Sequence, residues 1–317
     1  MSDPPNRGPA DGLIRKTMIG VVLGVLLYAG WILYSGYEPV AAALADYQWS
    51  AVAAALVLSS TNYLIRFVKW ELCLGWLGVR DPQTGAPQLT RGRSLLIYLA
   101  GLSMSVTPGK VGEVLRSWLL RSTDGIAFAR TAPIVLVDRL TDFVALVLLS
   151  LVGVMQYRDY LPVVVGSIVL VLIGIGILGS PRLCHRLLDG LERLPGIGGL
   201  AGKARGLVDS SAELMAARVL LSLSILSVIG WGLECLGYYF ILHGFFGVEA
   251  SLAVCTFLWA VTTLIGALSF LPGGLGATEG SLALLITELA VGVSPEIALA
   301  STMLIRACTL WYGEVVG

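Results

Sequence analysis

The chain has few charged residues and few of the residue types that bind metals or form disulfides. Charged residues make up 13% of its 317 residues, against roughly 25% in soluble domains. Two histidines and five scattered cysteines without a C-x-x-C pair predict neither a metal site nor a disulfide framework. The net charge of +0, with no basic run, argues against nucleic acid as a partner.

What the chain has instead is apolar sequence, with 56% hydrophobic residues and a mean hydropathy of +0.83. This composition predicts an all-α, polytopic integral membrane protein. No cofactor is expected. The first apolar run, 17–34, follows Arg15 and Lys16 without a cleavage site, so it is predicted to be a retained span. Further spans are predicted at 49–72, 131–155, 161–179, 219–242 and 296–317.

Two other apolar regions, 94–120 and 250–291, are each interrupted by a Pro-Gly motif. Proline lacks a backbone donor and glycine lacks a Cβ, so the backbone is expected to leave its helix there. Most of the resulting pieces are shorter than the roughly 20 residues of a span, which favours re-entrant hairpins, although 250–271 is long enough to cross. The predicted hairpin-break residues are Pro108, Gly109, Gly112, Pro272, Gly273 and Gly276.

The distribution of Lys and Arg sets the orientation, with the N-terminus and the C-terminus both predicted in the cytoplasm. Three full crossings separate the two broken regions, and an odd number inverts the second copy. We therefore predict an inverted repeat, in which Pro108 aligns with Pro272 and Asn62 with Gly230. Chance similarity in a chain with 38 glycines is the alternative. The predicted parts are a tail (1–14), a first membrane part (15–180), a cytoplasmic amphipathic linker (181–218) and a second membrane part (219–317).

Ionisable residues inside these spans form the candidate site. Each costs roughly 2.5 to 3.5 kcal/mol if unpaired in mid-membrane, so each must be paired, hydrated or bound to a ligand. A helix that restarts after a break also presents its positive N-terminal end, which suits a phosphate. The candidate substrate-binding residues are Lys110, Glu113, Arg116, Arg139, Asp142, Glu279, Arg306, Arg66 and Glu234; no catalytic residue is assigned.

Two interpretations of these charges stay open. In one, Glu113 pairs with Arg139 and Glu279 with Arg306, and the pairs only hold each hairpin against the next span. In the other, Lys110, Arg139 and Arg306 bind an anionic lipid headgroup, while the glutamates position them or carry a proton. Arg66 and Lys69 either receive a headgroup at the cytoplasmic side or snorkel to the interface beside Trp70.

The motifs resemble those of a known family. They are Arg66-x-x-Lys69-Trp70, Thr107-Pro108-Gly109-Lys110-Val111-Gly112-Glu113-x-x-Arg116, Asp138-Arg139-x-x-Asp142 and Leu271-Pro272-Gly273-Gly274-Leu275-Gly276-Ala277-Thr278-Glu279-Gly280. This pattern resembles the lysylphosphatidylglycerol synthase transmembrane, or flippase-like, family, with Asp138 where glutamate is expected. No soluble aminoacyl-transferase domain, as in its bifunctional members, follows here. The resemblance therefore implies lipid translocation rather than aminoacyl transfer.

The expectation is a flippase in the cytoplasmic (inner) membrane of a prokaryote, moving a lipid with an anionic or aminoacylated headgroup. A polyprenyl-phosphate lipid would also suit the cations. The alternatives are a membrane-embedded transferase that uses Glu113 or Glu279 as a base, and an accessory subunit of a lipid pathway. Gly20 and Gly24 suit packing within the monomer or a homodimer, and the basic residues of the linker suit non-specific attraction to anionic lipid.

Overall fold

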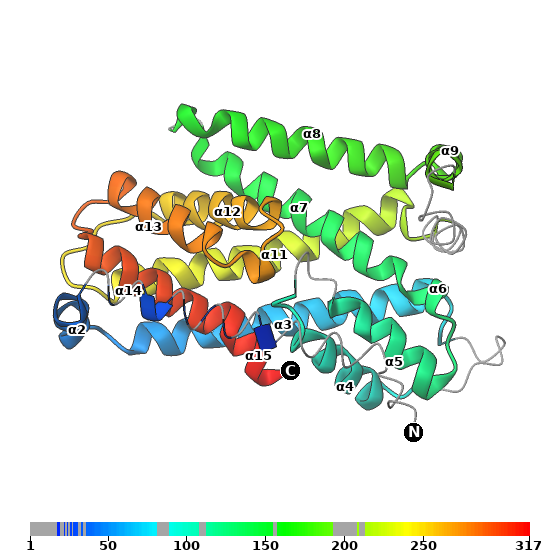
Figure 1. Cartoon of the computed structure of the whole chain (residues 1–317), viewed down its shortest axis with the longest axis horizontal. Helices are drawn as coiled ribbons and strands as arrows, with labels where there is room; N and C mark the ends of the chain where they lie inside the picture. The colour runs from blue at the N-terminus through cyan, green and yellow to red at the C-terminus, as the bar shows by residue number, and fades with distance from the viewer. Residues whose placement is uncertain are drawn as a thin grey trace, which may run out of the picture. The chain divides into compact units, whose positions relative to one another are not determined.

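The computed structural model is helical throughout the residues that it describes (Figure 1). These are 18, 19, 22, 24, 26, 28–30, 33, 36–80, 89–107, 112–154, 157–192, 208 and 213–317. Within these ranges no strand is present, and the one isolated antiparallel bridge pairs Glu249 with Val291. The predicted all-α membrane class is confirmed.

The long helices coincide with predicted spans. Both α3 (Ser50–Trp76) and α11 (Ala217–His243) are long and apolar enough to cross a membrane by themselves. The next two predicted spans correspond to the helices α7 (Pro133–Val154) and α8 (Leu161–Leu178), which pack against each other. The last predicted span is divided into α14 (Pro295–Arg306), the π-helical turn η5 (Ala307–Trp311) and α15 (Tyr312–Val316).

Both Pro-Gly regions are interrupted helices, as predicted. In the first, a break separates α4 (Arg91–Leu102) from α5 (Leu115–Asp124), and Pro108, Gly109 and Lys110 lie outside the described residues. In the second, the 3-10 turn η4 (Pro272–Gly274) separates α12 (Leu252–Leu268) from α13 (Ala277–Leu289). Helix α13 packs against both α12 and α14 (Figure 1). Re-entry of either hairpin into one face of the membrane remains a prediction.

Glycine makes the second break possible. Gly273, Gly274 and Gly276 have φ angles of 58°, 69° and 83°, values that L-residues with a Cβ rarely adopt. A Cβ on Gly273 would also lie 3.2 Å from Leu310 of η5. The backbone therefore turns tightly between α12 and α13, and α13 begins afresh after Gly276.

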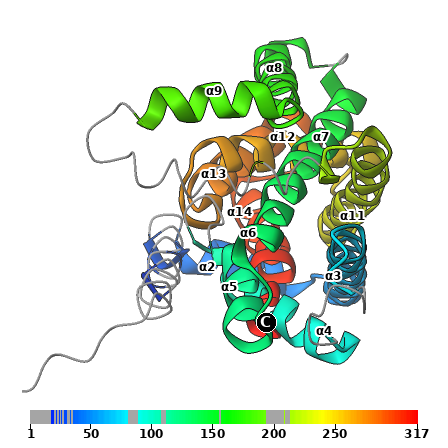
Figure 2. The ribbon, with the colours of Figure 1, turned by 90° about the vertical axis from the view of Figure 1, so that its right-hand side faces the viewer.

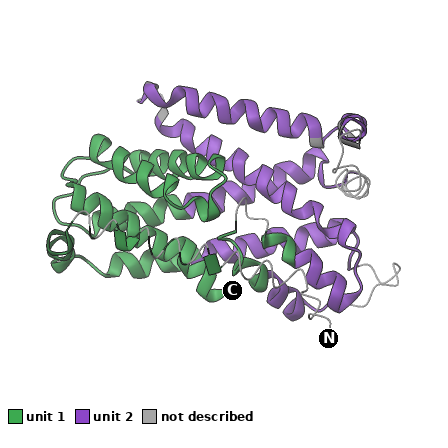
Figure 3. Cartoon of the chain, in the orientation of Figure 1, with its two compact units in different colours: residues 1–59, 99–115, 234–317 green, residues 60–98, 116–233 purple. Residues whose placement is uncertain are grey.

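Two compact units divide the described chain (Figure 3). Unit 1 comprises residues 1–59, 99–115 and 234–317, and unit 2 comprises 60–98 and 116–233. In unit 1, α2 (Tyr37–Ala45) packs against α14, with an apolar cavity of about 530 Å³ between them. In unit 2, α7 also contacts the short helix α6 (Phe128–Thr131), and α8 follows the turn η3 (Arg158–Tyr160).

The polar linker begins with a helix that leaves the line of the preceding span. Helix α9 (Pro181–Glu192) follows α8, and the two helix axes meet at 91° (Figure 2). Residues 193–207 and 209–212, which contain the rest of the predicted linker, lie outside the described part of the chain. A helix that bends off a span at this angle has the geometry of one lying along a membrane surface.

Helices α3 and α11 approach each other closely within unit 2. A Cβ on Gly230 of α11 would collide with the side-chain amide oxygen of Asn62 of α3. These two positions are the ones aligned in the predicted repeat, so aligned residues face one another. The inverted repeat itself stays a prediction.

Candidate functional site

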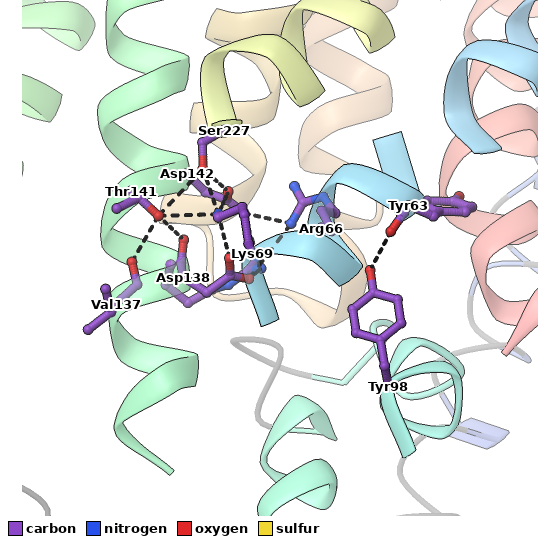
Figure 4. A network of polar contacts seen from close by, with 10 residues as sticks. Tyr63, Arg66, Lys69, Tyr98, Val137, Asp138, Thr141, Asp142 and Ser227 are labelled. Atoms are coloured by element: carbon purple, nitrogen blue, oxygen red, sulfur yellow. Dashed lines mark hydrogen bonds and ion pairs between the residues drawn. The ribbon is translucent and has the colours of Figure 1, made fainter. Parts of the chain in front are cut away.

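The main cluster of charged side chains in unit 2 joins α3 to α7 (Figure 4). Helical spacing places Arg66 and Lys69 on one face of α3 and Asp138 and Asp142 on one face of α7. Lys69 Nζ lies 2.5 Å from Asp138 Oδ1 and 3.2 Å from Asp142 Oδ1. Arg66 Nη1 lies 2.9 Å from Asp142 Oδ2. The two helices are therefore joined by paired charges rather than by apolar contacts alone.

Arg139 completes this cluster from α7 itself. Its Nη2 lies 2.9 Å from Asp138 Oδ2 and 3.1 Å from Asp142 Oδ2. We call Arg66, Lys69, Asp138, Arg139 and Asp142 the unit 2 charge cluster. Its three cations face two carboxylates, so it carries one positive charge in excess.

Exposure rises from one side of the unit 2 charge cluster to the other. The side chains of Lys69 and Asp142 are 2% and 5% exposed, whereas those of Arg66 and Arg139 are 13% and 19% exposed. Arg66 and Arg139 are thus the more exposed cations of the cluster.

Lys69 is the fully enclosed member of the cluster. Its ammonium group also donates to Ser227 Oγ at 2.6 Å and to Thr141 Oγ1 at 3.2 Å, so oxygens surround it (Figure 4). The interpretation that Lys69 snorkels to the interface is therefore wrong, because its side chain points inward. Arg66 lies 5.0 Å from the ring centroid of Trp231, a cation–π contact.

A second charged group lies in unit 1, at the start of α13. Glu279 is completely buried, and its Oε1 accepts hydrogen bonds from Arg306 Nε at 2.7 Å and from the Tyr28 hydroxyl at 2.9 Å. Its Oε2 accepts from the backbone N–H of Gly276 at 2.8 Å. Arg306 Nη2 also donates to the Gly273 carbonyl at 2.6 Å. The protein's own carboxylate thus occupies the positive end of α13.

The contact expected between Glu279 and Arg306 is present in this group. The π-helical turn η5 follows Arg306 directly and places Trp311 against Tyr28, with ring centroids 6.2 Å apart. A Cβ on Gly24 would meet the Trp311 ring at 2.5 Å, so this glycine packs within the chain. That Glu279 and Arg306 also bind a substrate stays a prediction.

The first break is closed by different residues. The N–H of Gly112 donates to Thr107 Oγ1 at 2.6 Å. Glu314 of α15 accepts from Ser105 Oγ at 2.9 Å and from the N–H of Val106 at 2.8 Å. A carboxylate therefore stabilises each break. At the first break it belongs to Glu314 of α15, and at the second it belongs to Glu279 in the first turn of α13.

The remaining candidate residues are spread over both units. Glu113 is 4% exposed in the helical turn before α5, and Lys110 lies outside the described residues. Glu234 of α11 is 7% exposed and accepts from Trp259 Nε1 at 3.2 Å. Arg116 of α5 lies in unit 2 with two aromatic rings beside it. Among the described residues, no group of three His, Cys, Asp or Glu side chains is arranged to bind a metal.

Several residues of these groups were not among the predicted site residues. Lys69 and Asp138 belong to the sequence motifs, and their spacing from Arg66 and Asp142 is the signal that identifies them. Ser227, Tyr28 and Glu314 carry no such signal, because hydroxyls are common in apolar spans and Glu314 stands outside every motif.

Comparison with known proteins places this arrangement in a family. The family model described as "Lysylphosphatidylglycerol synthase TM region" matches residues 19–317. The chain belongs to this family. Two relatives from Methanothermobacter thermautotrophicus, each named "UPF0104 membrane protein", are both 25% identical to it. One alignment covers 96% of this chain and 94% of the relative, and the other covers 93% and 90%.

Membership of the lysylphosphatidylglycerol synthase transmembrane family confirms the resemblance carried by the motifs. It identifies a membrane protein of a family linked to lipid handling. The unit 2 charge cluster comprises both the Arg66-x-x-Lys69 motif and the Asp138-Arg139-x-x-Asp142 motif, so two parts of the family-like pattern meet in one place.

Proposed function

We propose that this protein translocates a lipid with an anionic or aminoacylated headgroup across the cytoplasmic membrane of a prokaryote. The observation that carries the proposal is the unit 2 charge cluster, which brings five charged side chains together between predicted spans. The family's description names the transmembrane region of a lysylphosphatidylglycerol synthase, which is consistent with a lipid substrate.

The cost of these charges argues for a role beyond stability. A charged residue in mid-membrane costs roughly 2.5 to 3.5 kcal/mol on insertion scales, and intramembrane ionisable groups are commonly functional. A buried ion pair replaced by apolar residues of similar volume is often no less stable. Holding α3 against α7 would not by itself require Lys69 and the two aspartates, so we assign the cluster to substrate handling.

The exposure gradient suggests how a headgroup would bind. Lys69 is enclosed by carboxylate and hydroxyl oxygens, so it orients the two aspartates. Arg66 and Arg139 are the more exposed cations. A phosphate or carboxylate oxygen would meet these guanidinium groups, and an amino group on the headgroup would meet Asp138, whose side chain is 15% exposed.

The experiment is transport of labelled phosphatidylglycerol in proteoliposomes made with the purified full chain. Arg139→Gln and Arg66→Gln should each abolish translocation, because each removes a guanidinium group that would contact the headgroup. Arg121→Gln is the matched control, since Arg121 is exposed in the last turn of α5 and is not a member of the cluster. All variants are first checked for wild-type yield and a monodisperse elution profile.

Two results would contradict the proposal. One is wild-type translocation by well-folded Arg139→Gln and Arg66→Gln proteins. The other is the absence of translocation by wild-type protein for phosphatidylglycerol, its lysyl ester and a polyprenyl phosphate alike.

A further inference from the structure

One buried cation has no acidic partner among the described residues. Arg116, in the first turn of α5, is 6% exposed, and no ion pair joins it to a carboxylate of the described residues. Its Nε has no hydrogen-bond acceptor. Arg66, Arg139 and Arg306 each contact a carboxylate instead. Arg116 therefore differs from the other candidate arginines in the one respect that matters for binding an anion.

Two aromatic rings fix the position of the Arg116 side chain. Its Cζ lies 4.5 Å from the ring centroid of Tyr98 and 5.8 Å from that of Trp70. Each ring is anchored in turn, since Trp70 Nε1 donates to Ser94 Oγ at 3.1 Å and the Tyr98 hydroxyl donates to the Tyr63 carbonyl at 3.2 Å. Contacts with ring faces stabilise the cation but supply no lone pair in the guanidinium plane. The N–H edge of Arg116 thus remains available.

The residue that follows Arg116 in the chain also has an orphaned group. The Ser117 side chain is completely buried, and its Oγ has no hydrogen-bond partner. Both residues lie near the start of α5, where the helix dipole favours an anion and disfavours a cation. Buried polar groups in native proteins nearly always have a partner. Two unsatisfied donors near one helix start, with no carboxylate of the described residues in an ion pair with Arg116, indicate a missing acceptor.

We infer that Arg116 binds a phosphate group, with two phosphate oxygens accepting from the edge of the guanidinium. Arginine binds tetrahedral oxyanions in this bidentate way, and the flanking rings orient its edge for the contact. The source of the phosphate is a membrane phospholipid or a soluble phosphate of the same chemistry. Naming a phospholipid rests on the proposed function; the presence of an anion site on Arg116 does not.

The test measures equilibrium binding to the purified full chain in detergent, with thermophoresis as the readout. The probes are dioctanoyl phosphatidylglycerol, inorganic phosphate and dioctanoyl glycerol, which has the same tails without the phosphate. Wild-type protein should bind the first and not the third. Arg116→Gln should weaken binding of phosphatidylglycerol by about tenfold or more, a change of about 1.4 kcal/mol. Arg121→Gln, on the exposed part of the same helix, should bind like wild type.

Further variants keep the test decisive if Arg116→Gln does not fold. Arg116→Lys retains the charge but loses the planar fork, so it should bind phosphatidylglycerol less tightly than wild type. Ser117→Ala keeps the arginine and removes the second orphaned donor, and a smaller loss is expected. The affinity of each variant for phosphatidylglycerol is compared with that of Arg121→Gln, after the variants have been shown to have the same thermal stability.

The outcomes separate the two proposals. The phosphate site is overturned if Arg116→Gln binds phosphatidylglycerol as tightly as Arg121→Gln does. If Arg116→Gln is unstable, Arg116→Lys takes its place in this comparison. Equal binding of dioctanoyl glycerol by wild type also overturns it, since the tails alone would then explain affinity. Inorganic phosphate that binds as tightly as the lipid supports the site with a soluble source. Binding that depends on Arg116 in a wild-type protein that transports no lipid leaves the site standing and removes the proposed function.

Discussion

The carboxylate of Glu279 provides the sharpest test of how the second break is held. Glu279→Gln preserves the size of the side chain but removes the negative charge beside Arg306. It also replaces one acceptor oxygen by an NH2 group. Because Oε1 and Oε2 both accept from donors, the new NH2 must face either the Gly276 N–H or the donors of Arg306 and Tyr28.

The expected cost follows from burial. Glu279 is 0% exposed and the Arg306 side chain is 9% exposed, and removal of one partner from a buried ion pair costs about 3 to 5 kcal/mol. Arg306→Gln alone should cost a similar amount, because it leaves the carboxylate uncompensated. The double variant leaves no buried charge, so its cost should fall short of the sum of the two by about 1 to 3 kcal/mol.

The measurement is the free energy of unfolding of the four proteins in one detergent, combined as a double-mutant cycle. The same four proteins are then assayed for lipid translocation. A stable double variant that transports at the wild-type rate would mean that the pair only holds the hairpin. A stable double variant that does not transport would mean that the charges take part in transport.

The reasoning about Glu279 would be refuted by either of two results. One is a cost below about 1 kcal/mol for Glu279→Gln, which would place the pair in the range of exposed ion pairs. The other is a double variant less stable than the sum of the single variants predicts.

Two further predictions concern backbone and thiol chemistry. Gly276→Ala should lower the free energy of unfolding by about 1 kcal/mol or more, because alanine rarely adopts a φ of 83°. No atom lies within 4 Å of the added Cβ, so this cost comes from the backbone conformation and not from a steric clash. Gly280→Ala lies inside α13, also with no atom within 4 Å of the added Cβ, and should stabilise the protein by about 0.4 to 1 kcal/mol. If chemical denaturation showed that both variants stabilise the protein, or that both destabilise it, the argument would be contradicted. Burial raises the pKa of the Cys184 thiol in α9, so at neutral pH maleimide should label it more slowly than an Arg182→Cys thiol in a Cys184→Ser background. The difference between the two labelling rates should become smaller as pH rises. Equal rates at neutral pH would contradict this prediction.

Sequence predicted the helices well because their signals are local. Runs of apolar residues mark α3, α7, α8 and α11, and the Pro-Gly motif at 272–276 marks a break whose positive φ angles only glycine adopts readily. The contact between Glu279 and Arg306 was also predicted, since the position of each relative to the break and the next span was evident.

The direction of Lys69 could not be predicted in the same way. Spacing within α3 places it beside Arg66, but only the packing of α7 and α11 supplies Asp138, Asp142 and Ser227. For the same reason, Arg116 looked like one cation among several. Glu113 stands three residues before Arg116, yet no ion pair joins Arg116 to a carboxylate of the described residues, and the sequence pattern does not reveal this.

The two breaks differ in the timing of their completion during synthesis. The carboxylate that caps α13 belongs to Glu279, three residues from the N–H that it accepts, so this contact can form as soon as the turn emerges. Val106 instead donates to Glu314, which is 208 residues further along the chain. At about 5 to 20 residues per second, the ribosome reaches Glu314 roughly 10 to 40 seconds after Val106. During that interval the Val106 N–H must donate to water, a lipid headgroup or the insertion machinery. The first break therefore acquires its carboxylate contact after the second, although it is translated first.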